Sequence, residues 1–163
     1  VGNNFDGLGF VNGLKKSEIV INDKTFCIFG AGGAGMAIAF SLLKENIKKL
    51  KIVNRDKLRG KKLKDRLQLF FPQSFVEFEG LDNYDISDID VIVNATSIGL
   101  KENKELPFHV NQTNDNCIIA DIIMEPEETE LIKQAKKLKR QVHLGNNMLI
   151  NQIELAGKFL EIW

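Results

Sequence analysis

Hydrophobic positions along the chain follow two alternating periods. Short apolar or alternating runs, bounded by glycine, proline or polar clusters, predict β-strands. Between them, apolar residues recur at the three- to four-residue spacing of an amphipathic helix. The strands are expected at 25–30, 50–54, 75–79, 90–96, 116–123 and 141–144. The helices are expected at 5–15, 33–46, 57–70, 127–139 and 147–162.

This alternation of strands and helices predicts the fold class. Strands separated by helices favour an α/β fold of the Rossmann type, a doubly wound, mainly parallel sheet with helices on both faces. The length of 163 residues fits one domain covering 1–163. The helix at 127–139 is expected to begin directly after Pro126, with Glu127 and Glu128 in its first turn, where carboxylates suit the helix dipole.

Composition narrows the classes of function. The 22 basic and 22 acidic residues give no net charge, which argues against a nucleic-acid partner. The apolar runs are too short for a bilayer span and no signal peptide is recognisable, so no membrane partner and a cytoplasmic location are expected. Cys27 and Cys117 are expected in the core, and the isolated His109 and His143 offer no metal-ligand set. The sequence does not predict the oligomeric state.

A glycine-rich segment after the first expected strand carries the strongest local signal. Residues 30–35 read Gly-Ala-Gly-Gly-Ala-Gly, a G-x-G-x-x-G motif between a strand and a helix. Gly30 allows the tight turn, Gly32 lets a pyrophosphate approach the backbone, and Gly35 lets helix and sheet pack closely. The alternative is a plain turn between strand and helix. The motif predicts a dinucleotide site at Gly30, Ala31, Gly32, Gly33 and Ala34.

The end of the second expected strand bears on the choice of cofactor. NAD-binding domains usually have an acidic residue there for the ribose hydroxyls. Here the strand ends in Asn54 and Arg55, with Arg59 close behind, and two guanidinium groups would bind a 2′-phosphate. Asp56 lies between them and would repel that phosphate. NADP is therefore the expected cofactor, and NAD stays the alternative.

Several further segments extend along nearly the whole chain. They read GNNFDGLGF at 2–10, NATSIG at 94–99, DIIMEPEET at 121–129 and GNNMLINQ at 145–152. With the glycine loop and the Asn54 segment, they make the chain resemble the cofactor-binding half of shikimate dehydrogenases, in the shikimate/quinate dehydrogenase family.

The resemblance implies an NADP-dependent oxidoreductase that interconverts shikimate and 3-dehydroshikimate, on the route to chorismate and aromatic amino acids. The substrate would be a small cyclic hydroxy acid. Family members have a preceding α/β domain with most of the substrate pocket and a catalytic lysine. The chain starts at Val1 without an initiating methionine, and we expect it to follow such a domain and to be inactive without it.

The resemblance also implies roles for individual residues. Asp6 matches a catalytic aspartate beside the reacting hydroxyl, and Gln152 matches a substrate-binding glutamine. Without the resemblance, Asp6 would be interpreted as a turn or helix-cap residue. The remaining residues implied to contact the cofactor are Asn94, Ala95, Thr96, Ser97, Gly145 and Met148.

Three positions depart from the family pattern. Phe5 and Asp56 stand where the family usually has threonine, and Met124 stands where it usually has tyrosine. They leave three alternatives open: a quinate or other hydroxy-acid dehydrogenase using NAD, another Rossmann enzyme such as a methylenetetrahydrofolate dehydrogenase-like one, or a non-catalytic nucleotide-binding domain.

Overall fold

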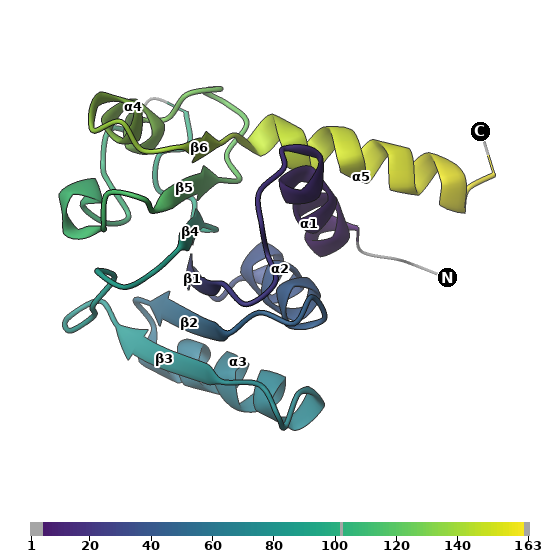
Figure 1. The fold of residues 1–163 in the computed structure, drawn as a ribbon, viewed down its shortest axis with the longest axis horizontal. Helices are drawn as coiled ribbons and strands as arrows, with labels where there is room; N and C mark the ends of the chain where they lie inside the picture. The colour runs from purple at the N-terminus through teal and green to yellow at the C-terminus, as the bar shows by residue number, and fades with distance from the viewer. Residues whose placement is uncertain (1–4, 102, 162–163) are drawn as a thin grey trace.

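The central feature of the computed structural model, which describes residues 5–101 and 103–161, is a six-stranded sheet (Figure 1). The strand order is β3-β2-β1-β4-β5-β6, and every neighbouring pair is parallel. β2 and β3 are added on one side of β1, and β4, β5 and β6 are added on the other side. Doubly wound sheets bind ligands at this switch point between β1 and β4. The strands are β1 Thr25–Phe29, β2 Lys49–Asn54, β3 Val76–Gly80, β4 Val91–Asn94, β5 Ile118–Asp121 and β6 Val142–His143.

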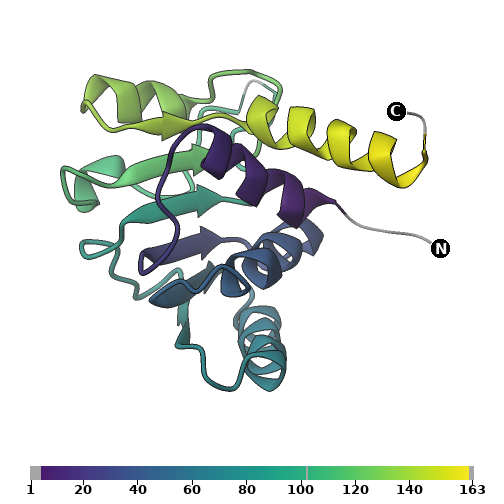
Figure 2. The same cartoon turned by 45° about the vertical axis from the view of Figure 1, so that its right-hand side comes forward.

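Helices cover both faces of this sheet, as the sequence predicts (Figures 1 and 2). Phe26 and Ile28 of β1 pack into one core with residues of α1, α2, α3 and α5, whereas Cys27 and Phe29 pack into the other with α4 and the 3₁₀ helix η1. This alternation is the period of two that a strand imposes. The helices are α1 Asp6–Lys16, α2 Gly33–Leu43, α3 Lys57–Phe70, η1 Val110–Gln112, α4 Glu130–Lys137 and α5 Gly145–Phe159.

The expected start of the helix after Pro126 is wrong. α4 begins at Glu130, and Glu127 and Glu128 precede it. Thr129 is the N-cap, because its side-chain oxygen accepts a hydrogen bond from the Ile132 N–H at 3.4 Å. A threonine cap satisfies one of the free amides of the first turn.

The last helix begins at Gly145, two residues before its expected start at position 147. A β-carbon at Gly145 would lie 2.5 Å from the Ile123 carbonyl oxygen. The helix therefore starts where the missing side chain lets it touch the segment that leaves β5.

α1 lies between α2 and α5, and Figure 2 shows α1 and α5 side by side. A β-carbon at Gly7 would lie 2.1 Å from the Ala37 carbonyl oxygen of α2. The close approach of the two helices thus depends on the glycine that directly follows Asp6.

Both cysteines are buried in the core, as expected, and both are free thiols. Burial raises the pKa of Cys27, and it raises the pKa of Cys117 to about 12. The thiols therefore stay protonated and serve as small core side chains.

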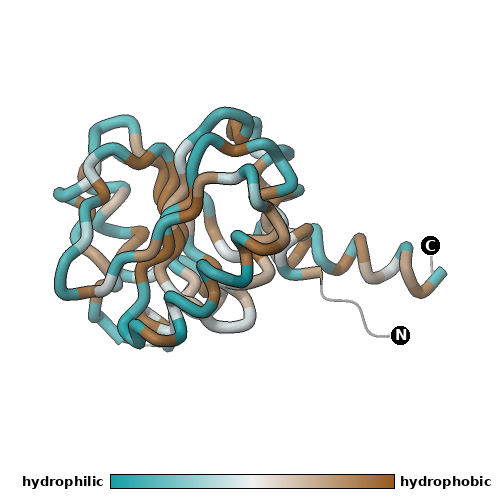
Figure 3. The backbone as a smooth tube through the Cα atoms, turned by 90° about the horizontal axis from the view of Figure 1, so that it is seen from below, coloured by the Kyte–Doolittle hydropathy of each residue, from teal (hydrophilic) through white to brown (hydrophobic). Residues whose placement is uncertain are grey.

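Figure 3 shows the apolar backbone segments gathered in the body of the domain and α5 extending beyond it. Within the described ranges, no helix has the length and apolar character needed to cross a bilayer. The same residues contain no group of three or more histidine, cysteine or acidic side chains arranged to hold a metal ion.

Candidate functional site

The glycine loop joins β1 to α2 in a turn that requires its glycines. Gly30 has a positive φ of 108°, and a β-carbon there would lie 2.8 Å from the Ala95 carbonyl oxygen. A β-carbon at Gly35 would lie 2.2 Å from the Gly30 carbonyl oxygen, so Gly35 has the packing role expected of it. Gly32 differs, because no atom lies within 4 Å of the position of its β-carbon. The loop is therefore closed toward the sheet and open at Gly32, where a ligand would approach the backbone.

A pocket of about 330 Å³ opens at the carboxyl ends of β1, β2 and β4. It brings together most of the residues expected to bind the cofactor: Gly30, Ala31, Gly32, Asn54, Arg55, Arg59, Ala95, Thr96 and Ser97. It also includes five residues that the sequence reasoning missed: Phe29, Val53, Leu81, Ile98 and Pro107. For Leu81 a signal existed, since it directly follows β3 at the same edge of the sheet.

The two arginines contribute the charge of this pocket. Arg55 and Arg59 are exposed, and among the described residues neither guanidinium takes part in an ion pair. The Asp56 carboxylate accepts a hydrogen bond from the Arg59 backbone N–H at 3.0 Å and caps α3. Among the described residues that line the pocket there is no carboxylate. The pocket surface is therefore suited to an anion, and Asp56 has a structural task at its border.

Asn54 connects the arginine segment to the glycine loop. Its Oδ1 accepts a hydrogen bond from the Ala31 N–H at 3.0 Å, and its Nδ2 donates to the Asp56 carbonyl at 2.8 Å. These bonds fix the glycine loop relative to the segment that carries the arginines, because one side chain bridges both.

The opposite wall rests on a buried polar network. Asn94 is 0% exposed, and its Oδ1 accepts hydrogen bonds from the backbone N–H and the hydroxyl of Thr96. Its Nδ2 donates to the Ile98 carbonyl and to Asp121, which also accepts from the Thr129 hydroxyl at 2.7 Å. Burial raises the pKa of Asp121, and these hydrogen bonds oppose the shift. Asn94 thus shapes the turn of Thr96 from beneath and does not itself line the pocket.

A second pair of expected site residues meets outside the lining of this pocket. Gln152 Nε2 of α5 donates a hydrogen bond to Asp6 Oδ1 at the start of α1, at 2.7 Å across 146 positions of sequence. Close by, the Phe5 ring meets the Phe159 ring edge-on at 5.6 Å between centroids. Met148, on the same helix as Gln152, is only 6% exposed and belongs to the core.

Four further residues expected to contact the cofactor lie outside the pocket lining: Gly33, Ala34, Gly145 and Met148. Gly33 and Ala34 form the first turn of α2, directly after the open position Gly32. Gly145 begins α5 against the segment that leaves β5. Their roles toward a cofactor stay predictions.

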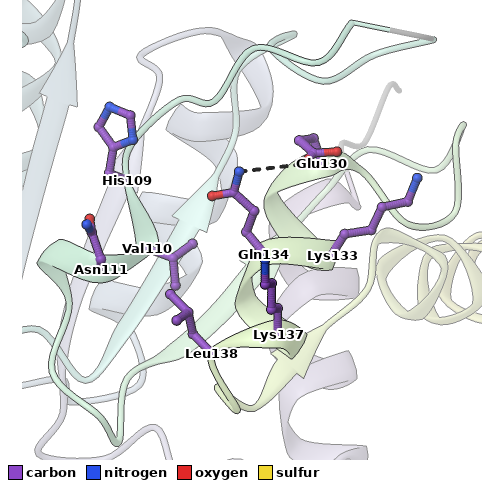
Figure 4. Close-up of a pocket in the computed structure, with 8 residues that line it drawn as sticks. All are labelled: His109, Val110, Asn111, Glu130, Lys133, Gln134, Lys137 and Leu138. Atoms are coloured by element: carbon purple, nitrogen blue, oxygen red, sulfur yellow. Dashed lines mark hydrogen bonds between the residues drawn. The ribbon is translucent and has the colours of Figure 1, made fainter.

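A separate hollow of about 420 Å³ lies between η1 and α4 (Figure 4). Figure 4 shows His109 and Lys133 on opposite sides of it, with Gln134 hydrogen-bonded to Glu130 at 3.4 Å. None of the expected site residues lines this hollow. It is a surface depression that lies apart from the glycine loop.

Strand order, glycine loop and arginine-lined pocket together define a dinucleotide-binding domain of the Rossmann type. A family model described as shikimate / quinate 5-dehydrogenase matches residues 13–142. The chain belongs to this shikimate/quinate dehydrogenase family.

Similar proteins include enzymes of both specificities. A shikimate dehydrogenase (NADP(+)) of Methanosphaera stadtmanae is 38% identical over 93% of this chain and 54% of its own length. A crystal structure of a shikimate dehydrogenase in complex with NADP+ has 34% identity and a TM-score of 0.89, and it covers 97% of this chain and 56% of that one. A quinate dehydrogenase from Corynebacterium glutamicum, in complex with NAD, has 28% identity and a TM-score of 0.84 over 93% of this chain and 54% of that one. The chain thus spans a little over half the length of these relatives.

Proposed function

We propose that the chain is the NADP-binding part of a shikimate dehydrogenase, an enzyme that interconverts shikimate and 3-dehydroshikimate. The observation that carries the proposal is the pocket in which Arg55 and Arg59 join the glycine loop with no carboxylate among the described lining residues. A relative named as an NADP enzyme and a similar enzyme whose structure contains NADP+ support the cofactor. The activity of the whole enzyme, its substrate and its location in the cytoplasm are parts of the same proposal.

The residues of the pocket fit the two anionic parts of NADP. Free amides at the start of α2, next to the open Gly32, would bind the pyrophosphate. Arg55 and Arg59 would bind the 2′-phosphate, since both guanidinium groups are exposed and lie at the end of β2. When bound, NADP supplies the nicotinamide ring that accepts the hydride.

Asp6 and Gln152 would serve the substrate. Oxidation of an alcohol carbon requires loss of the hydroxyl proton as the hydride leaves. Asp6 would receive a hydrogen bond from that hydroxyl beside the family's catalytic lysine. Gln152 would hold the Asp6 carboxylate in place and also contact the substrate. The 2.7 Å bond between the two side chains supports a shared role toward the substrate.

Quinate with NAD is the second candidate. The similar Corynebacterium glutamicum enzyme is named a quinate dehydrogenase and was crystallised with NAD. Phe5 and Met124 also stand where the family usually has threonine and tyrosine, so the substrate contacts can differ from those of the NADP enzymes.

A titration of Arg55→Ala with both cofactors tests the proposal. The variant should bind NADP at least about tenfold more weakly and bind NAD within about twofold of the unchanged chain, because one charge-assisted contact to the 2′-phosphate is lost. Arg66→Ala is the matched control, since Arg66 is an exposed arginine of α3 outside the pocket. Equal weakening of both cofactors would contradict the proposed phosphate site.

A further inference from the structure

A buried lysine in the middle of the sheet has no part in the site as described. Among the described residues, Lys51 is the one lysine in the buried class, at 4% exposure, and it lies in β2 beside Cys27 of β1. Removing an ammonium group from water is costly unless it is paired and hydrogen-bonded. An apolar residue would serve the core at least as well, so the contacts of Lys51 need an explanation.

These contacts all lead to one turn. Lys51 Nζ donates to the Asp85 carbonyl at 2.6 Å and pairs with Glu79 Oε1 of β3 at 3.1 Å. Glu79 Oε2 in turn accepts a hydrogen bond from the Asp85 N–H at 3.1 Å. The ion pair therefore holds both backbone groups of Asp85.

The other end of the turn is also fixed. Gly80 ends β3 in register with Asn54, and the Asn83 N–H donates to the Gly80 carbonyl at 3.2 Å. Lys57 pairs with Asp82 at 2.7 Å, but both side chains are well exposed and such a pair contributes little. Of the two ion pairs at residues 80–85, the pair of Lys51 and Glu79 is thus the more buried, and the Tyr84 ring adds an edge-on contact with Phe29 at 5.3 Å.

Leu81 connects this turn to the cofactor pocket. It lines the same pocket as Arg55 and Arg59 and is 40% exposed. β1 leads to the glycine loop, β2 leads to the arginines, and β3 leads to Leu81, so the three groups lie in a row along the sheet edge. A dinucleotide with its pyrophosphate at the first group and its 2′-phosphate at the second would bring its base toward the third.

We propose that Lys51 and Glu79 are positioning residues that hold the turn at 80–85, so that Leu81 forms an apolar wall for the adenine ring. This inference rests on the proposed NADP site. Contact between Leu81 and the adenine ring adds most to the affinity when the turn is already fixed, because a mobile turn would lose conformational entropy on binding.

The test is a double-mutant cycle between Lys51→Met and Leu81→Ala, with 2′,5′-ADP as the ligand. Each single variant should bind about fivefold more weakly, the effect of losing part of one apolar contact. The double variant should also bind only about fivefold more weakly. Once Lys51→Met has released the turn, Leu81 no longer contributes to binding, so its removal has no further effect. Multiplied losses of about twenty-five-fold, or no loss in Lys51→Met, would overturn the positioning role.

Lys49→Met is the matched control. Lys49 lies on the same strand and pairs with Glu77 of β3 at 3.3 Å and with Asp88 at 3.8 Å, neither of which belongs to the turn at 80–85. It should leave 2′,5′-ADP affinity unchanged and leave the effect of Leu81→Ala at about fivefold. A loss like that of Lys51→Met would show a general effect of sheet charge and contradict the proposal.

The variants are expected to fold. Removing one partner of an ion pair is costly when the charge left behind is buried, but the Glu79 side chain left by Lys51→Met is 29% exposed and reaches water. Glu79→Gln is the second variant, which keeps an acceptor for the turn and should lose less than Lys51→Met; an equal or larger loss would count against the proposal. If the unchanged chain binds neither 2′,5′-ADP nor NADP, the proposed function fails, and the inference fails with it; binding with an additive cycle rejects the inference alone.

Discussion

The two halves of the candidate site are built in different ways. The cofactor pocket comes mainly from one stretch of the chain that runs from β1 and the glycine loop through α2 and β2 to the start of α3. The Asp6–Gln152 pair instead joins the first and the last helix across 146 positions. Hydrogen bonds within the stretch fix the pocket, such as the one from the Ala31 N–H to the Asn54 side chain, whereas the pair depends on how α1 packs between α2 and α5.

This difference separates two kinds of vulnerability. A change in the packing of α1 should disturb Asp6 and Gln152 and leave the pocket able to bind nucleotides. A change at the arginine segment should alter the pocket and leave α1 in place. Three variants test this independence.

The largest effect is expected from Gly7→Ala. The new methyl group would lie 2.1 Å from the Ala37 carbonyl and 2.3 Å from the Ser41 hydroxyl, so α1 must move away from α2. Overpacking of this kind should lower the free energy of unfolding by about 3 kcal/mol. Urea denaturation measures the loss, and 2′,5′-ADP binding to the protein that remains folded should stay within about twofold.

Gly33→Ala is the control for that substitution. No atom lies within 4 Å of the Gly33 β-carbon position, and the residue lies in the first turn of a helix, where alanine is favoured. The free energy of unfolding of Gly33→Ala should be equal to that of the unchanged chain or slightly higher. If Gly7→Ala were equally harmless, the packing of α1 would not be what holds Asp6 in place.

The second effect comes from His143 beneath α1. Its ring is 2% exposed and packs edge-on against Phe10 at 5.8 Å, and neither ring nitrogen has a hydrogen-bond partner among the described residues. Burial lowers its pKa from 6.5 to about 4. The unfolded chain therefore takes up a proton between these values that the folded chain does not, and stability is lost as the pH falls from 6.5 toward 4. The loss should reach roughly 3 kcal/mol at the acid end.

Urea denaturation at several pH values measures this contribution by comparison with His143→Leu. The variant should lose less stability between pH 6.5 and 4 than the unchanged chain, because the buried proton acceptor is gone. His109→Gln replaces the exposed histidine and is the control for removal of an imidazole elsewhere in the chain. Identical profiles for His143→Leu and the unchanged chain would exclude His143 as the source of the acid sensitivity.

The same contrast explains what the sequence could predict. Periodicity predicted the six strands and the five α-helices in their observed order, because each pattern reports burial on one face, but it missed the starts of α4 and α5. The start of α4 was missed, since Pro126 followed by two glutamates is typical of a helix start, while the actual cap, Thr129, lies further on. The start of α5 was missed because it depends on contact between Gly145 and a segment outside its own helix.

The candidate site divides along similar lines. The glycine loop and the arginines follow from local motif chemistry, and the pocket contains them as expected. The nearness of Asp6 and Gln152 required the family resemblance, because no local pattern links two helices at opposite ends of the chain. Neither the local motifs nor the family resemblance pointed to Leu81 or to the Lys51–Glu79 pair, since an apolar turn residue and a charge within a strand belong to no motif.

The smallest effect is expected from Asp56→Asn. This variant tests whether the Asp56 carboxylate opposes binding of the 2′-phosphate. Asparagine caps a helix about as well as aspartate, so the bond to the Arg59 N–H should persist and stability should change by less than about 0.5 kcal/mol. If the Asp56 carboxylate is directed to its cap and away from the bound phosphate, NADP affinity should rise by no more than about twofold. Titration with NADP and NAD at constant ionic strength measures this change. A tenfold gain for NADP alone would mean that Asp56 opposes the 2′-phosphate, and the pocket would then be a compromise between the two cofactors. Asp65→Asn, on the same helix but outside the pocket lining, separates that specific effect from a general change in surface charge.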